Sequence, residues 1–443
     1  MARQHSRSCD CTKTELDLFA VPPTQTSLES GSWDTYYPIS TVTDTGPIEF
    51  NIPGDGVEYL DLASTQLYIR AKILKANGNA LGAQSFPGPV NNWMHSLFEQ
   101  IDVSLGGTVI SSSDRMYPYR AYLENLLSLG NDAKETQLST CLWAKDTARQ
   151  MDSRTSKEPA DGDQVRNTGL VKRGAYTKTS AEVEMVGRLH CDIFTTDRFL
   201  LNRVPLRLKL MRSPDKFSLM APDDEKYKIN ILEAVLLVRR VEISPSVFLA
   251  HEKTLRMGPA KYPLKRVVCK YFPVPQNSTS SRQENLFQGQ VPTRIIVGCV
   301  SSKAFDGAYD KNPFNFQHFK IDHINLSVKG QKNTIKPLNP NFPNQSLLSY
   351  LSLLTGTAKW GKDEGCGFSR KDHSHGYCLF AWDLTADQSE GGDHFQLIRN
   401  SGVRLEINFA EALTEPINVV VYAEFENLVM VDADRNVTAN YLL

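Results

Sequence analysis

The chain contains the same series of segments twice. The segment FEQIDVSLGGTVISS, which starts at Phe98, is similar to FKIDHINLSVKGQKNTI, which starts at Phe319. Each is followed by a Leu-rich segment, then by an apolar segment ending in CDIFTTD or AWDLTAD, and then by RLKL or RLEI. The last segments, which start at Asn230 and Asn418, align without a gap. A repeat unit of about 200 residues is far longer than the repeat of a solenoid, so this pattern predicts a duplicated domain.

Most of the repeated segments have the composition of β-strands. They are rich in β-branched and apolar residues, and turn-forming residues bound them. Strands are predicted at residues 65–74, 183–194, 204–211, 229–243, 262–274, 293–300, 376–385, 402–409 and 417–431. Short helices are predicted at residues 117–130 and 346–356, each ending in a glycine that suits a helix C-terminus.

Each half of the chain therefore combines roughly eight strands with a short helix and a long loop, which is the content of a jelly roll. The predicted fold class is all-β: two tandem jelly-roll β-sandwiches (a double jelly roll) with a few short helices. The predicted divisions are an N-terminal arm at 1–30, a first jelly roll at 31–243, a second at 244–434 and a C-terminal tail at 435–443.

The first half contains the longer insertion. The offset between matching residues falls from 221 at Phe98 and Phe319 to 188 at Asn230 and Asn418. The extra residues lie in the polar, turn-rich segment 145–178, which we expect at a surface. We expect it to tolerate a short peptide inserted at residues 161–162.

Composition excludes several classes of protein. The 443 residues carry 49 Lys and Arg against 50 Asp and Glu, a net charge of −1, which argues against a protein that coats nucleic acid. The eight cysteines are mostly isolated, so we expect reduced thiols in an intracellular protein. We find no secretory signal and no apolar run of membrane-spanning length. The first fourteen residues are polar, and we expect them to be disordered in a free subunit.

Two tandem jelly rolls resemble the double jelly-roll major capsid proteins of Polinton (Maverick) elements and adintoviruses, which are relatives of adenovirus hexon. The stretches that carry the resemblance are residues 15–33, 91–107, 117–128, 379–388 and 404–432. Their specificity comes from their order together with the internal repeat, since none is a catalytic signature. The chain is much shorter than adenovirus hexon and lacks its tower insertions, so we expect short outer loops.

The resemblance implies a structural protein of the virion, not an enzyme. Three copies would form a pseudo-hexameric, hexon-like capsomer, and capsomers would tile an icosahedral shell. The implied partners are further copies, neighbouring capsomers and a penton or minor capsid protein, with assembly inside the host cell in the nucleus or cytoplasm. No cofactor, small-molecule substrate or sequence-specific nucleic-acid contact is implied.

Several motifs could carry chemistry but have a simpler interpretation. Cys366, His373, His375 and Cys378 are possible zinc ligands, but their spacing matches no standard module, and a loop leading to a buried strand cysteine is the alternative. SLGG at residues 104–107 lacks the lysine and Ser/Thr of a phosphate-binding loop, so we predict a hairpin turn.

Three further segments are ambiguous in the same way. Cys9 and Cys11 suit exposed thiols on an arm better than a metal site. Residues 387–394 hold carboxylates and glycines but lack the alternating ligands of a calcium loop, so a solvated loop is predicted. Arg239 and Arg240 lie near a strand end, where edge protection or a salt bridge between subunits is a better interpretation than genome binding.

Two other functions stay open. An enzyme built on paired β-sandwiches, such as a glycosidase, would need two carboxylates facing one cleft, and no pair is evident in the sequence. A cellular binding protein derived from an endogenised viral gene, without shell assembly, is compatible with all of these features.

Overall fold

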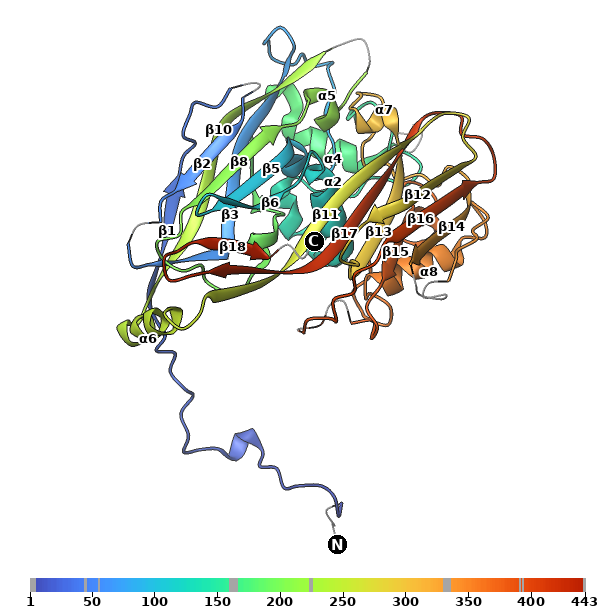
Figure 1. Ribbon diagram of the computed structural model, residues 1–443. Coiled ribbons are helices and arrows are strands. Elements are labelled where there is room, and N and C mark those ends of the chain that lie inside the picture. Colours follow the sequence, from blue (N-terminus) through green and yellow to red (C-terminus); the bar gives the residue numbers. More distant parts are fainter. Residues whose placement is uncertain are drawn as a thin grey trace.

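The strands of the first half form two antiparallel sheets, with the orders β1-β10-β3-β7 and β2-β8-β5-β6 (Figure 1). Apolar residues alternate along these strands, so each strand has one apolar face. The computed structural model describes residues 5–43, 46–54, 56–158, 166–222, 226–329, 336–389, 392 and 394–440. The first-half strands are β1 Leu28–Tyr36, β2 Ile48–Ile52, β3 Tyr59–Lys75, β5 Phe98–Leu105, β6 Thr108–Ser112, β7 Val183–Arg188, β8 Leu206–Arg212 and β10 Tyr227–Ile243. The two-residue strands β4 (Gly88–Pro89) and β9 (Leu219–Met220) pair with each other. Numbered along the chain, the eight long strands have the orders 1-8-3-6 and 2-7-4-5, which is the jelly roll.

The second half repeats this topology. Its sheets have the orders β11-β17-β13-β15 and β12-β16-β14, and β18 pairs with β17. The strands are β11 Ala260–Val274, β12 Ser280–Phe287, β13 Arg294–Ser301, β14 Ile321–Val328, β15 Leu379–Asp383, β16 Val403–Phe409, β17 Ile417–Val431 and β18 Val437–Asn440. The first sheet again has the order 1-8-3-6, and the second begins 2-7-4. Residues 330–335 lie outside the described residues.

The repeat in the sequence and the repeat in the fold coincide. The opening segments form β5 and β14, each the fourth strand of its roll, and the last segments form β10 and β17, each the eighth. The strand pairs also correspond: β5 pairs with β8 in the first roll, and β14 pairs with β16 in the second. The predicted fold class of two tandem jelly rolls is confirmed.

Helices are short and lie between strands. They are α1 Trp93–Ser96, α2 Tyr117–Ser128, α3 Asn131–Glu135, α4 Thr168–Thr177, α5 Asp215–Ser218, α6 Pro245–Leu255, α7 Ser302–Phe305, α8 Leu347–Gly356 and α9 Arg370–His373, with 3-10 turns η1 Thr14–Leu16, η2 Gln137–Cys141, η3 Lys178–Ser180 and η4 Asp192–Thr195. The two predicted helices, α2 and α8, are confirmed, whereas α4 and α6 were missed. The predicted strand 183–194 ends at Arg188, because η4 follows it.

The role predicted for the two helix-ending glycines is wrong. Gly130 precedes α3 with φ −74°, so it does not adopt the left-handed conformation of a C-terminal glycine. Gly356 is the last residue of α8, and a Cβ there would lie 2.5 Å from the backbone carbon of Ala381. Close packing of α8 on β15 therefore explains this glycine.

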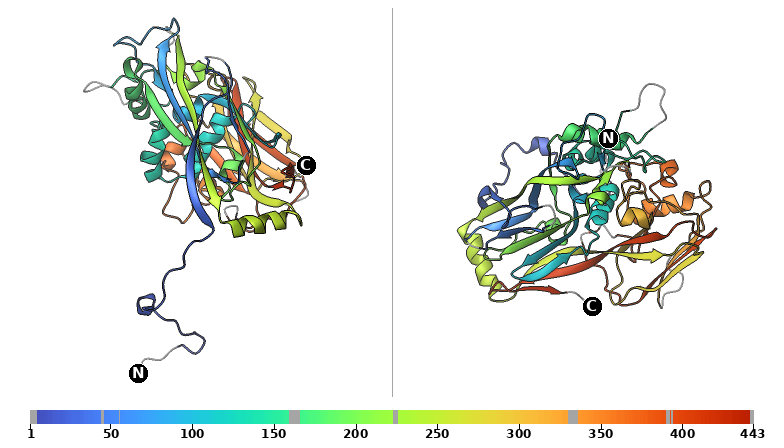
Figure 2. Two further views of the ribbon diagram at one scale, coloured as in Figure 1. Left: turned by 90° about the vertical axis from the view of Figure 1, so that its left-hand side faces the viewer. Right: turned by 90° about the horizontal axis from the view of Figure 1, so that it is seen from above.

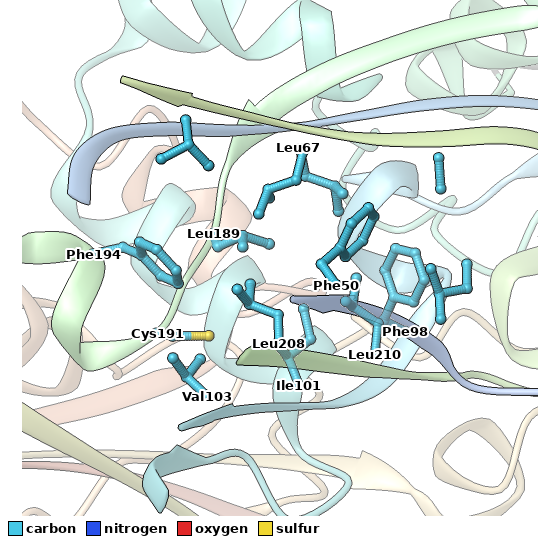
Figure 3. Packing of buried hydrophobic residues seen from close by; sticks show 14 of the residues in the cluster. Phe50, Leu67, Phe98, Ile101, Val103, Leu189, Cys191, Phe194, Leu208 and Leu210 are labelled. Carbon is cyan, nitrogen blue, oxygen red and sulfur yellow. The ribbon is translucent and has the colours of Figure 1, made fainter. Parts of the chain in front are cut away.

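The first core lies between the two sheets of the first roll (Figure 3). Phe50 of β2, Phe98 of β5 and Leu208 of β8 meet Leu67 of β3 there. The second core lies between the sheets of the second roll and is lined by Val297, Ile324, Leu405, Val421 and similar residues. Each sheet thus buries one face within its own roll.

A third apolar cluster joins the two rolls. Helix α2 contributes Tyr122 and Leu126, and the outer face of the β11-β17-β13-β15 sheet contributes Val420 and Ile296. The ring of Tyr122 stacks on Phe314 with centroids 4.2 Å apart. We call this cluster, together with the polar groups beside it, the junction.

The long strands β11 and β17 extend past the second core. Tyr262 and Leu264 near the start of β11, and Val429 and Val431 at the end of β17, pack in the first core. Figure 1 shows this pair of strands running from the second roll toward the first. The rolls are therefore joined by shared strands as well as by the junction.

The insertion predicted at a surface is partly buried, which corrects that prediction. Arg173 and Asp146 are 1% and 0% exposed and form an ion pair of 2.6 Å. Asn312 of the second roll donates to the same carboxylate at 3.1 Å. Charged residues that neutralise one another can be buried, so polar composition alone did not reveal this packing. Residues 161 and 162 lie outside the described residues.

The N-terminal segment leaves the body of the molecule. Every residue from His5 to Ser27 is exposed, and Figures 1 and 2 show the segment extending away from the end where α6 lies. Among the described helices, none has the length and apolar character needed to cross a membrane.

Candidate functional site

The junction contains a buried group of ions on α2. Leu123, Leu126 and Leu127 turn the apolar face of this helix toward the second roll. Arg120 is buried beside that face, and Glu124, one turn further along the helix, is partly buried; their side chains are 2.8 Å apart. A helix that buries both an apolar face and an ion pair needs further partners for the two charges.

Those partners come from both rolls. Arg120 contacts Asp192 at 2.7 Å, and Asp192 accepts a hydrogen bond of 3.2 Å from the backbone N–H of Val267 on β11. Glu124 contacts His190 at 2.5 Å and accepts a hydrogen bond of 3.4 Å from the Tyr422 hydroxyl on β17. The ions therefore link α2 to the two longest strands of the second roll.

Burial and charge act in opposite directions on Glu124. Burial raises the pKa of this carboxyl, but the charge of Arg120 and the hydrogen bond with His190 outweigh it and lower the pKa to about 2. The pKa of the neighbouring His95 is well below its usual value, because burial, and after it the electrostatic effect of His190, disfavours the protonated form of His95. Glu124 is thus ionised and His95 neutral at physiological pH.

A second ion pair extends the junction across the sheet. Arg294 on β13 pairs with Glu424 on β17 at 3.2 Å, and the Tyr422 hydroxyl donates to Glu424 at 2.8 Å. Arg294 also donates to the carbonyl of Gly356 at the end of α8, at 3.0 Å. Each charge at the junction has an opposite charge or a hydrogen-bond partner, which suits a structural contact.

Only a weak signal in the sequence marks these residues. Arg120 and Glu124 were not among the predicted site residues, although an Arg and a Glu four residues apart on an otherwise apolar helix are unusual. Asp192 and Glu424 carried no signal, because their partners lie far away in the chain.

Each of the four possible zinc ligands makes its own structural contact. The His373 ring donates to the carbonyl of Leu379 at 3.0 Å, and His375 donates to that of Lys371 at 2.8 Å. Cys366 packs in the junction and Cys378 in the second core, where burial raises the pKa of each thiol. Within the described residues, no group of three or more His, Cys, Asp or Glu side chains is placed to hold a metal ion.

Arg239 and Arg240 do not protect an edge, which corrects that interpretation. Strand β10 lies inside its sheet, between β1 and β3. Arg240 is buried and pairs with Asp34 of β1 at 2.7 Å within the same chain. Arg239 points outward and is exposed.

The remaining motifs form a hairpin turn, a pair of exposed thiols and a contact between a carboxylate and a histidine. SLGG forms the predicted hairpin turn between β5 and β6, and Gly106 and Gly107 have φ angles of 56° and 88°. Cys9 and Cys11 are exposed free thiols. In the segment 387–394, the Asp387 carboxylate contacts His394 at 3.1 Å, and residues 390, 391 and 393 lie outside the described residues.

The surface of the molecule carries a separate feature, a set of exposed apolar side chains. Leu16, Leu18, Phe19 and Val21 of the N-terminal segment are all exposed. Another group, Phe395, Leu397 and Ile398, lies in the loop between β15 and β16. Large exposed apolar side chains that gather in this way favour contacts with another macromolecule.

Comparison with known proteins shows what the chain resembles. No family model matches it. A protein of Caenorhabditis elegans described as uncharacterized protein F54H12.2 is 24% identical over 434 residues, covering 94% of this chain and 98% of that protein.

Solved structures of viral shells have the same fold. The Sputnik virophage structure aligns with a TM-score of 0.67 and 10% identity, covering 98% of this chain and 93% of that one. The PBCV-1 virus capsid model gives a TM-score of 0.58 at 10% identity, covering 96% and 99%. The mavirus major capsid protein gives 0.53 at 11% identity, covering 100% and 97%. The fold is therefore shared along nearly the whole length of each chain.

Proposed function

We propose that this chain is a major capsid protein of the hexon-like, double jelly-roll class. The observation that carries the proposal is the pair of topologically matching jelly rolls, joined by a buried junction and aligned over nearly their full length with viral shell proteins. Its role would be structural and not catalytic, and its location would be the virion, after assembly in the nucleus or cytoplasm of a host cell.

The duplicated fold supports a homotrimer. Three copies with two similar rolls each present six similar units around one axis, so the capsomer has a nearly hexagonal outline. Such pseudo-hexameric blocks can tile an icosahedral shell, with a penton or minor capsid protein filling other positions. In this proposal the rolls divide near residues 243 and 244, between β10 and α6.

The mass in solution tests the trimer. Three chains of 49.7 kDa have a mass of about 149 kDa, which light scattering measures directly. Negative-stain microscopy of the same sample should show hexagonal blocks or shells. A folded chain that remains a monomer or dimer at micromolar concentration would contradict the proposal.

We also propose that the gene belongs to the Polinton and adintovirus group, on the basis of the ordered sequence stretches described above. Neighbouring genes for a packaging ATPase, a protease and a protein-primed polymerase would support this lineage. A gene that stands alone among host genes would contradict it.

A second candidate is a cellular binding protein derived from an endogenised viral gene. The relative in Caenorhabditis elegans favours it, because an animal encodes a chain that is similar in sequence over nearly its full length. The mass measurement separates the two candidates, since only the capsid protein needs to form trimers.

A further inference from the structure

The N-terminal segment carries an apolar contact sequence that its own body leaves exposed. Phe19 is 98% exposed, and Leu16, Leu18 and Val21 beside it are also exposed. These side chains occupy one short stretch, which we call the arm motif (residues 16–21). Leaving so many large apolar groups in water is unfavourable, so the arm motif has the composition of a segment that packs on a partner.

The charge of the segment indicates what kind of partner this is. Residues 1–27 carry three basic side chains, Arg3, Arg7 and Lys13, and three acidic ones, Asp10, Glu15 and Asp17. A segment that binds an anionic lipid surface or nucleic acid carries an excess of positive charge. The prolines Pro22 and Pro23 also prevent a membrane-lying helix from continuing past Val21. A neutral, extended, apolar segment suits an apolar protein surface.

A surface of that kind lies in the second roll. Phe395, Leu397 and Ile398 are exposed in the loop between β15 and β16, and Leu397 is 90% exposed. We call these three residues the loop patch. Its backbone is anchored, because the Gln396 N–H donates to both carboxylate oxygens of Glu426 at 2.8 Å and the Val291 N–H donates to the carbonyl of Arg399 at 2.8 Å. An anchored loop that presents apolar side chains loses little conformational entropy when it binds.

Both features lie at the same end of the molecule. Figure 1 shows the loop between β15 and β16 at the lower end, where the N-terminal segment also leaves the body beside α6. The segment leaves from the first roll, whereas the loop belongs to the second. Copies that stand side by side in one orientation would bring the first roll of each copy next to the second roll of its neighbour. Such a head-to-tail contact closes into a ring when the rotation between copies is a whole fraction of a turn.

The segment is long enough for this contact. The twelve residues from Leu16 to Ser27 can span roughly 40 Å when extended. A body of this size has a radius of gyration of about 22 Å. The arm motif can therefore pass the edge of its own body and reach an adjacent copy.

We propose that the arm motif of one copy packs on the loop patch of a neighbouring copy. This inference rests on the proposed function, since it specifies a contact within the assembled shell protein. The occupant of the loop patch is a second copy of the same chain.

Cross-linking with isotope-labelled chains tests the contact. A photoreactive phenylalanine analogue replaces Phe19 in the full-length protein, and ¹⁴N and ¹⁵N chains are mixed before assembly. We expect cross-linked peptides that join residue 19 to the segment 394–400 and contain one peptide of each isotope. Cross-links in which both peptides always share one isotope would show that the segment folds back on its own body, and would overturn the inference.

Paired substitutions give a second test that does not depend on the analogue. Phe19→Lys and Leu397→Glu should each raise the protein concentration needed for half-assembly by about tenfold, and the double variant should recover most of that loss. Met257→Asp is the matched control, because Met257 is a highly exposed apolar residue following α6 that the contact does not include. All three positions are exposed, so the variants should fold. If Met257→Asp weakens assembly as strongly as Phe19→Lys, the contact is not specific.

The two proposals fail in different ways. A folded chain that stays monomeric in light scattering contradicts the capsid proposal and with it the contact. A chain that forms trimers or shells without cross-links between residue 19 and the segment 394–400 contradicts only the contact.

Discussion

The eighth strands of the two rolls, β10 and β17, occupy the same place in matching sheets but have different surroundings. In β10, buried and partly exposed residues alternate over the first half of the strand, whereas the first nine residues of β17 are all buried. The outer face of β17 lies against α2, and the outer face of β10 is partly open to solvent. The same topology therefore gives one sheet with a partly exposed outer face and one sheet with a covered outer face. The difference depends on what packs against that face.

The same contrast holds for one pair of charges. In the first roll Arg70 of β3 pairs across the sheet with Glu233 of β10 at 3.1 Å, with side chains 36% and 37% exposed. In the second roll Arg294 of β13 pairs with Glu424 of β17 at 3.2 Å, with side chains 14% and 9% exposed. An exposed pair of this kind contributes little to stability, whereas breaking a buried one leaves an uncompensated charge.

The largest expected effect comes from a charge on the covered face. Val420→Asp should lower the free energy of unfolding by about 5 kcal/mol or more, because the carboxylate would be buried in the junction without a partner. Leu232, the residue aligned with Val420 in β10, is partly exposed, and Leu232→Asp should cost only about 1 kcal/mol. Leu236→Asp, in the first core, should resemble Val420→Asp. Denaturant unfolding of the three variants measures these values, and equal losses at Val420 and Leu232 would contradict the comparison.

The two Arg–Glu pairs give the next largest difference. Arg294→Met should destabilise the protein by roughly 4 kcal/mol, since it removes a positive charge that pairs with the buried Glu424 carboxylate. The matched Arg70→Met should have a much smaller effect, because water screens this exposed pair. Thermal or denaturant unfolding compares the pair, and a similar loss in both variants would show that the junction is more hydrated than its burial indicates.

Acid should weaken the junction before it weakens the cores. The pKa of Glu124 in the folded chain is about 2, below its ordinary value of 4.5, so its ionised form stabilises the fold above pH 4.5. That contribution, roughly 3 kcal/mol, is lost as the pH falls from 4.5 through about 2. Glu124→Gln should flatten the stability profile in this window, and Glu29→Gln, at an exposed position on β1, should not. Two parallel profiles would contradict the assigned role of Glu124.

The smallest expected effect concerns the insertion that only the first half contains. A short polar peptide inserted between residues 161 and 162 should change the free energy of unfolding by less than about 1 kcal/mol, because lengthening a loop has a small entropic cost. An insertion next to Asn167 should do more harm, since this buried side chain donates to Asp146 at 2.8 Å and caps α4. Soluble yield and unfolding midpoints of the two insertions check the difference.

Much of the fold could be predicted from the sequence because strand patterns are local. All nine predicted strands and both predicted helices exist, and their ends differ by a few residues except at the start of β3 and the end of β7, where the difference is six residues. The repeat then limited the topology, since one domain had to form twice. The predictions for the helix-ending glycines failed because the reasons for those glycines are not local: the backbone of β15, not a helix cap, requires Gly356.

By itself, the sequence determined the duplicated all-β architecture and the continuous apolar run of β17, because side-chain periodicity and composition are properties of neighbouring residues. Only the tertiary structure decided which helix covers that strand and which charges meet there. Tyr422 and Glu124, which share a hydrogen bond, are 298 residues apart in the chain, and the buried end of the insertion binds Asn312 of the other roll. Such contacts depend on how two completed sandwiches pack together, and no periodicity along the chain records that packing.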